Sequence, residues 1–345
     1  MATSDMNEYD RSVWSEIERW RVKRLTTEQR YLLPERAREK VAATKQTAQD
    51  RLSDLPGAEK FAITFKQAFD GLLSLVQKSA EATVRRNAVV RSYAKQGHSV
   101  VDLDDIRKLE LRDIDKVKPR LGLRYTAASA VEGAGAGLVV SGGEILAAGG
   151  AVAGAGAGAA PGAGAVAATI VGDAVAVLAT MSRAVSHTAA YYGYNTEQPG
   201  EEVFALGVLN FGLAQQAGKG AAYAEINKLV QALAHNAAWQ QLNKNGVTHV
   251  VRRVYEALGY RLTKAKLGQA LPAVGIVIGA GLNARLLASL TRDADHIYRE
   301  RHLREKYGLE SAASEETDED TLDIVAFVDE AIDEEPRDAA PPLGP

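Results

Sequence analysis

Apolar residues recur at helical spacing along most of this chain. Between residues 10 and 31, Val13, Ile17 and Trp20 lie three or four positions apart, with basic residues between them. Such a period predicts amphipathic helices. The same pattern, interrupted by prolines and glycines, predicts further helices over residues 35–55, 58–96, 102–116, 174–194, 201–213, 222–242, 247–259 and 267–284. We therefore expect an all-α fold, a multi-helix bundle.

The first predicted helix combines tryptophan and basic residues. Trp14 and Trp20 flank one face, while Arg19, Lys23 and Arg24 lie between the apolar positions. A helix of this kind can lie in a membrane interface, but such a stripe more often docks on a protein core. We expect residues 1–30 to form an N-terminal helix that docks.

Acidic residues precede the apolar pattern that begins at residue 103. Asp102 or Asp104 is placed to cap a helix, because a short carboxylate side chain accepts the free N–H groups of a first turn. A calcium loop would also need its glycine and its terminal bidentate Glu, which this segment lacks. The pattern favours a cap, and we expect no metal site.

The centre of the chain is uncharged and rich in small residues. No charge occurs over the 28 residues between Glu144 and Asp173, a length that can span a bilayer. However, 20 of these 28 residues are Gly or Ala, and large aliphatic side chains are few. Insertion into lipid rewards Leu, Ile, Phe and Val, so the segment is at best a marginal single span.

Glycines in this region repeat every four residues. Rows of this kind let two helix backbones approach closely, and we expect Pro161 to break the run into a hairpin of two helices. A flexible loop is the alternative, since each helical Gly costs about 1 kcal/mol relative to Ala. The expected packing glycines are Gly133, Gly137, Gly150, Gly154, Gly158 and Gly162.

Charge divides the chain into two blocks. Residues 311–345 hold twelve acids and one base, a net −11, which leaves +8 of the total −3 for residues 1–310. A basic body favours an anionic partner such as a membrane surface, and an acidic tail can screen it or simply maintain solubility. We expect a helical domain over residues 31–310 and a mostly disordered tail over 311–345, with a short docking helix at residues 322–332.

Several motifs, in a fixed order, resemble the EcsC family over about residues 8 to 308. They are AFDGLL at 68–73, DLDDIRKLEL at 102–111, EGAGAG at 132–137, YYGYN at 191–195, PGEEVFALGVL at 199–209, GYRLTK at 259–264, LPAVG at 271–275, GAGLN at 279–283 and YRERHLREKYG at 298–308. The Gly/Ala content near residues 149–164 exceeds the family pattern. The resemblance implies a helical, membrane-associated protein connected with transport or secretion, and it supplies no catalytic residues.

An apolar run at residues 267–284 has cations at both ends. Lys264 and Lys266 precede it and Arg285 follows it, so the run suits a helix pair at a membrane interface or a buried core helix. Gly275 and Gly279 offer a second surface for close helix packing. Asn283 needs a hydrogen-bond partner if buried, which favours a role in helix register over a binding role. The candidate residues for lipid or partner binding are Lys264, Lys266, Asn283 and Arg285.

Catalytic motifs are missing from the sequence. It has no G-x-S-x-G elbow, no H-E-x-x-H pair and no cysteine. The segment 212–220 departs from the phosphate-loop spacing and lacks Ser or Thr after Lys219. Ser182 and His187 could meet a carboxylate in space, as could similar residues in any chain of this length. We expect no cofactor, and a hydrolase is less favoured than a soluble interaction scaffold.

These observations predict a membrane-associated helical protein that acts as an accessory or regulatory factor at the inner face of the cytoplasmic membrane. The absence of cysteine and of a basic, apolar leader agrees with a cytoplasmic location. An anionic membrane surface is the expected partner, together with transport or secretion proteins, whereas nucleic acid is not expected. The alternative is a soluble helical interaction scaffold.

Overall fold

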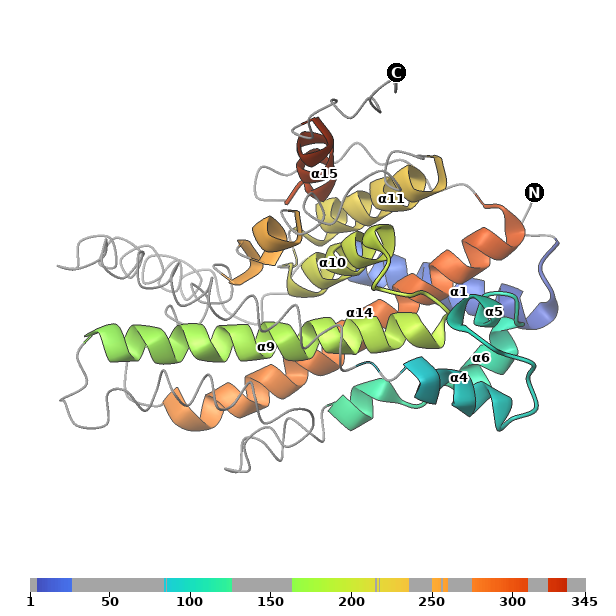
Figure 1. The fold of residues 1–345 in the computed structure, drawn as a ribbon, viewed down its shortest axis with the longest axis horizontal. Coiled ribbons are helices and arrows are strands. Elements are labelled where there is room, and N and C mark those ends of the chain that lie inside the picture. The colour runs from blue at the N-terminus through green and yellow to red at the C-terminus, as the bar shows by residue number, and fades with distance from the viewer. Residues whose placement is uncertain are drawn as a thin grey trace, which may run out of the picture.

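The computed structural model describes residues 5–26, 84, 86–125, 163–214, 216, 218–235, 250–255, 257–259, 275–309 and 322–333. Every regular element among these residues is a helix, which confirms the predicted all-α class (Figure 1). The helices are α1 (Glu8–Thr26), α4 (Arg86–Ala94), α5 (Leu103–Ile106), α6 (Leu111–Val117), α9 (Ala163–Tyr191), α10 (Pro199–Leu213), α11 (Lys219–His235), α14 (Gly275–Tyr307) and α15 (Ile324–Asp333).

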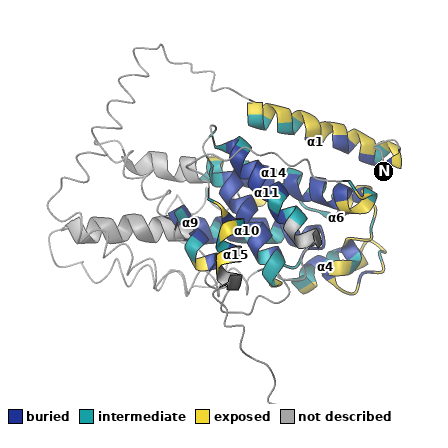
Figure 2. Cartoon of the chain, turned by 90° about the horizontal axis from the view of Figure 1, so that it is seen from above, coloured by how far each residue is buried: buried dark blue, intermediate teal, exposed yellow. Residues whose placement is uncertain are grey.

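Helix α10 occupies the middle of the described part. It packs against α9, α11 and α14, and residues 203–212 are all buried (Figures 1 and 2). Small residues permit this close packing, because a Cβ atom at Gly212 would collide with the side chain of Leu290 on α14. The layers therefore run from α9 and α14 through α10 to α11, with α15 on the outer side of α11.

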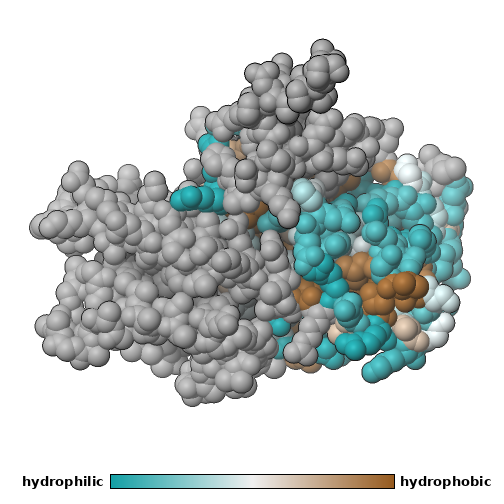
Figure 3. All heavy atoms as spheres, in the orientation of Figure 1, coloured by the Kyte–Doolittle hydropathy of each residue, from teal (hydrophilic) through white to brown (hydrophobic). Residues whose placement is uncertain are grey.

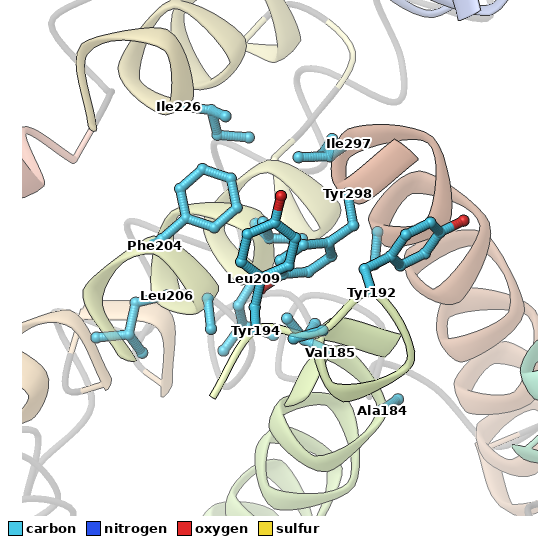
Figure 4. Close-up of a cluster of buried hydrophobic side chains, with 14 of the residues drawn as sticks. Ala184, Val185, Tyr192, Tyr194, Phe204, Leu206, Leu209, Ile226, Ile297 and Tyr298 are labelled. Atoms are coloured by element: carbon cyan, nitrogen blue, oxygen red, sulfur yellow. The ribbon is translucent and has the colours of Figure 1, made fainter. Parts of the chain in front are cut away.

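An aromatic cluster joins three of these helices (Figure 4). The ring of Tyr298 on α14 lies 5.5 Å from that of Tyr194, which follows α9, and 5.4 Å from that of Phe204 on α10. Tyr192 stacks on the same ring at 6.3 Å. Each such pair contributes about 0.5–1.5 kcal/mol beyond area burial, so the YYGYN segment is a packing element.

Helix α1 docks as the sequence predicts. Val13, Trp14 and Ile17 are buried, and Trp20 stacks on His296 of α14 with ring centroids 4.7 Å apart. The opposite face of α1 is exposed (Figure 2). The tryptophans of this helix therefore pack against the protein.

Several predicted helix boundaries agree with the structure. Asp102 caps α5, accepting a hydrogen bond from the Asp105 backbone N–H while the Asp105 side chain accepts in return. Gly97 has a positive φ of 87° three residues after α4 ends. The expected helix in the acidic tail is α15, whose Ile324 and Val328 are fully buried.

The longest helices are α14 with 33 residues and α9 with 29, and they pack against each other. Among the described residues, no helix is both long enough and apolar enough to cross a membrane. Helix α9 begins two residues after Pro161, where a break is predicted. The rest of the predicted Gly/Ala hairpin lies outside the described residues, and the two boundaries between the three predicted domains remain predictions.

Candidate functional site

The second half of α14 carries acids and bases into the protein interior. Asp293, Glu300, Arg301, His302 and Arg304 are all buried. An isolated buried charge is costly, so each must be neutralised by a partner or by loss of its charge. The partners come from α1, α10, α11 and the segments around α5 and α6, and they form four connected groups.

The first group surrounds Arg301. Its guanidinium pairs with Glu201 of α10 and lies 4.1 Å from the ring centre of Tyr194 and 4.3 Å from that of Phe204. Burial alone would lower the pKa of Arg301, but Glu201 more than offsets this and raises it. The ion pair fixes α10 to α14.

The second group surrounds Glu300. The Tyr223 hydroxyl of α11 donates a hydrogen bond of 2.6 Å to this carboxylate, and Arg304 donates another of 2.7 Å. Arg21 of α1 lies 3.8 Å away. Burial first, and then the charge of Glu300, raises the pKa of Tyr223, so its hydroxyl keeps its proton. Three helices thus meet at one carboxylate.

The third group contains a buried lysine. The Lys219 ammonium donates hydrogen bonds to the carbonyl oxygens of Phe211 and Gly212 at the end of α10, and it lies 3.6 Å from Asp293. Arg24 also donates to Asp293, at 2.6 Å. Burial lowers the pKa of Lys219 to about 8 against the opposing effect of Asp293. Lys219 therefore stabilises the C-terminal end of α10 by binding its last carbonyl oxygens. This is a structural role, whereas the lysine of a phosphate loop binds a phosphate group.

The fourth group connects α14 with the segment that follows α6. Lys118 pairs with Asp295, which also accepts a hydrogen bond of 2.9 Å from Tyr192. Arg299 pairs with Asp115 at 2.9 Å. Burial would raise the pKa of Asp295, but Lys118 and Arg299 lower it overall. This carboxylate therefore remains charged.

These groups tie helices together and show no arrangement for acid–base catalysis. The Ser182 hydroxyl bonds to the Tyr255 hydroxyl, whereas His187 bonds to the Tyr125 hydroxyl at 3.2 Å. Ser182 and His187, the two named members of the hypothetical triad, thus each have a tyrosine partner. Among the described residues, no cluster of His, Asp and Glu has the number and placement needed to hold a metal ion.

The outer side of α14 differs sharply from its inner side. Arg285 and Arg292 are exposed, and they lie seven residues apart, two helical turns along the same face. Arg292 donates a hydrogen bond to Ala288 of its own helix. No carboxylate in the described part of the chain forms an ion pair with either arginine.

A short helical turn at residues 121–125 lies beside this face and adds, with the residue before it, two more cations. Gly122 packs on α14, where its Cβ position would lie 3.9 Å from Thr291, the neighbour of Arg292. In this segment, Arg120 and Arg124 are exposed on either side of Leu123, which is 67% exposed. We define the basic surface as Arg120, Leu123, Arg124, Arg285 and Arg292. On the face seen in Figure 3, the described part is mainly hydrophilic with a smaller apolar area.

The structure places few of the candidate residues predicted from sequence. Arg285 is exposed, and Gly275, Gly279 and Asn283 lie in the first three turns of α14, with the surroundings of the Asn283 side chain outside the described part. The remaining candidates lie outside the described residues, namely Lys264, Lys266, Gly133, Gly137, Gly150, Gly154, Gly158 and Gly162. Sequence reasoning missed Arg292, although its seven-residue spacing from Arg285 was a usable signal. Arg120 and Arg124 gave no comparable signal.

The described part of the chain is an all-α protein with a network of buried charged residues on one long helix, α14. The model of the EcsC protein family matches residues 145–303, which include α9, α10, α11 and most of α14. The resemblance to this family is therefore confirmed for residues 145–303. Arg285 and Arg292 lie inside the matched range, while Arg120 and Arg124 precede it.

One curated relative is similar to most of this chain. The uncharacterized protein YdbA of Bacillus subtilis (strain 168) is 25% identical over 239 residues, which cover 69% of this chain and 76% of YdbA. No solved structure gives a significant match. The comparisons thus give the family and leave the activity to be inferred from the structure.

Proposed function

We propose that this protein binds the anionic inner face of the cytoplasmic membrane through the basic surface, as an accessory or regulatory factor of the EcsC type connected with transport or secretion. The observation that supports this most is the exposure of Arg285 and Arg292 on one face of α14 without a carboxylate partner in the described chain. Arg120 and Arg124 extend the same positive charge around an exposed leucine.

The contrast between the two sides of α14 favours this function. Inside, Arg301, Arg304 and Arg299 each have carboxylate partners. Outside, the guanidinium groups of Arg285 and Arg292 remain available to an external anion. Each basic residue near an anionic membrane contributes about 1 kcal/mol, and the attraction extends over a Debye length of about 10 Å at 0.1 M salt.

Leu123 supplies the apolar contribution to such binding. An exposed aliphatic side chain gains about 1.5–3 kcal/mol when it is fully buried in an apolar medium. One leucine is too little for stable membrane binding alone, as is one pair of arginines. Together they give weak, reversible and salt-dependent association, which suits an accessory protein at a membrane surface.

The test is vesicle flotation with a charge-reversal variant. R285E/R292E removes two cations and adds two anions, so binding to phosphatidylglycerol vesicles should fall at least roughly thirtyfold at low salt, given about 1 kcal/mol for each basic residue lost and the added repulsion of the two anions. The matched control is R91E/K95E, which makes the same change at two exposed cations of α4 and just beyond it. An equal loss of vesicle binding in both variants would show that the vesicles attract the protein through its net charge and not through the basic surface. No flotation of the parent chain on anionic vesicles would reject the proposal and favour a soluble interaction scaffold.

A further inference from the structure

Helix α15 packs on α11 and on the segment around Arg253, on the outer side of α11 (Figure 1). Ile324 and Val328 of α15, four positions apart, are fully buried. The Arg253 guanidinium lies 4.4 Å from the centre of the Phe327 ring and also pairs with Glu330. Amphipathic helices are recognised in this way, by aliphatic residues three or four positions apart. We define the helix-docking surface as α11 together with Arg253.

Glu225 of α11 recognises the backbone of the docked helix. Its Oε1 atom accepts a hydrogen bond of 3.0 Å from the N–H of Val325, in the first turn of α15. Glu225 is only 3% exposed, and burial raises the pKa of its carboxyl against the lowering effect of the Val325 N–H. The first N–H groups of a helix have no partner within it. A carboxylate placed here therefore binds the start of a helix without regard to its side chains.

The fit of α15 to this surface is imperfect at both ends of the helix. The Asp323 carboxylate accepts a hydrogen bond of 2.9 Å from the Ala326 N–H, so Asp323 and Glu225 bind adjacent N–H groups of one turn. These two carboxylates repel each other. At its other end, α15 has no basic residue in the last turn, where a cation would interact favourably with the helix dipole. Both features weaken the docking of α15.

The covalent connection compensates for this weak fit. Twelve residues, 310–321, lie between Leu309, just after α14, and Leu322, just before α15. A tether of this length holds a segment near its site at an effective concentration on the order of 1 mM, so a weak contact is still occupied. The α15 of a second copy fits no better and gains nothing by exchange. A helix from another protein can replace α15 if it fits better.

We propose that the helix-docking surface binds an amphipathic helix of a partner protein, and that α15 occupies this surface until the partner helix displaces it. The partner helix shares the pattern of Ile324, Phe327, Val328 and Glu330, which is two aliphatic residues four positions apart, an aromatic residue before the second and an acid two positions after it. It differs at its ends, with Ser or Thr as the cap and a basic residue in the last turn. This inference goes beyond the proposed membrane function and does not depend on it.

The probe is a fluorescein-labelled peptide of residues 320–335 that carries D323S and D333K, and its anisotropy reports binding to the full chain. I324S/V328S, which releases α15, should bind the peptide roughly tenfold more tightly than the parent chain. A tethered competitor with a dissociation constant of about 0.1 mM has an effect of that size at 1 mM. The peptide of unchanged sequence should bind the released chain at least roughly threefold more weakly, because it keeps both unfavourable ends.

The released chain also allows a test of the surface itself. Adding R253E to I324S/V328S removes an ion pair and a cation–π contact and places an acid opposite the acid of the peptide, so binding should fall roughly tenfold. The matched control adds R112E, which makes the same charge change at an exposed arginine of α6 and should leave binding unchanged. Circular dichroism confirms that each variant is folded.

Four results would overturn the proposal. The first is equal binding of the peptide by the parent chain and by I324S/V328S, which would place the peptide away from the α15 site. The second is an equal loss in R253E and R112E, which would show attraction by net charge. The third is no binding to either chain at millimolar peptide. The fourth is equal affinity of the two peptides, which would make α15 itself the fitting ligand and point to exchange between copies of this chain. Vesicle flotation is independent of all four.

Discussion

Arg301 and Glu201 form a two-point ion pair between helices that are 100 residues apart in sequence. The Nη1 and Nη2 atoms of Arg301 each lie 2.6 Å from a different carboxylate oxygen of Glu201. Nε of the same guanidinium donates to Glu305 at 2.9 Å. All three nitrogen atoms of the Arg301 guanidinium thus donate hydrogen bonds to carboxylates of α10 and α14.

Removing the charge of Glu201 should therefore be strongly destabilising. E201Q leaves Arg301 buried without its main counterion, and breaking a buried pair in this way costs about 3–5 kcal/mol. The free energy of unfolding, measured by urea denaturation, should fall by that amount. D113N is the control, because the Asp113–Lys116 pair on α6 is exposed and such pairs are worth about 1 kcal/mol or less. A similar small loss in both variants would show that Arg301 finds a replacement partner.

Gly193 should tolerate no side chain, in contrast to Gly97. Both have positive φ, 85° and 87°, which by itself costs an L-residue about 1 kcal/mol. At Gly193 a Cβ would also lie 2.6 Å from the Leu103 carbonyl oxygen and 2.9 Å from the Arg107 nitrogen, whereas at Gly97 the space is open. G193A should therefore lower the thermal midpoint several degrees more than G97A. Equal thermal midpoints for G193A and G97A would mean that α5 can shift away from the new methyl group at residue 193 without loss of stability.

Much of the fold follows from local sequence signals. Asp102 caps the start of α5, and Gly97 adopts a positive φ after the end of α4. Both effects involve only residues nearby in the chain, so they can be predicted from a single sequence. The same holds for the docking stripe of α1, because Val13, Trp14 and Ile17 share one helical face. Helical period and caps thus predict where helices lie and which side is buried.

The candidate site depends on contacts that sequence does not specify. Tyr125 and His187 are 62 residues apart, and Gly122 meets Thr291 across a larger interval. The charged motif at 298–308 is easily read as a solvated helix end, yet Arg301 and His302 are buried. Only tertiary packing decides which charges of such a helix find partners, so the spacing of Arg285 and Arg292 does not by itself show that both are exposed.

Stability should depend on His187 in mildly acidic solution. Its pKa is lowered from 6.5 to about 4 in the folded protein, chiefly by burial and then by Arg183 and Arg124. Between these two values the unfolded chain binds a proton that the folded chain does not, so stability falls as the pH drops from 6.5 towards 4. The slope is at most about 1.4 kcal/mol per pH unit and is reduced by partial exposure.

The variant H187Q isolates this contribution from the carboxylates that titrate nearby. Urea denaturation of parent and variant across the window should show the advantage of the parent shrinking as the pH falls. Above pH 7 the difference between the two should be constant. A difference that stays constant through the whole range would mean that His187 is protonated as easily in the folded state as in the unfolded state.

The acidic tail should weaken membrane binding through its charge. Its helix α15 docks on α11 through the buried Ile324 and Val328, and Arg253 pairs with Glu330, so the docked helix lies on the opposite side of α10 from α14. From there it leaves the basic surface uncovered and acts only through the long-range potential, which salt screens. Deleting residues 311–345 changes the net charge from −3 to +8 and should strengthen binding to anionic vesicles at low salt, with the gain shrinking as salt rises.

The control for this deletion is I324S/V328S, which releases α15 and keeps all twelve acids of the tail. If charge is the cause, the substituted chain should bind vesicles no more tightly than the parent, because its net charge is unchanged. Tighter binding by this variant would instead show that the docked helix covers a second membrane contact on α11. A deletion that leaves the affinity unchanged at low salt would reject electrostatic inhibition by the tail, since the removal of a net charge of −11 has its largest effect where screening is weakest.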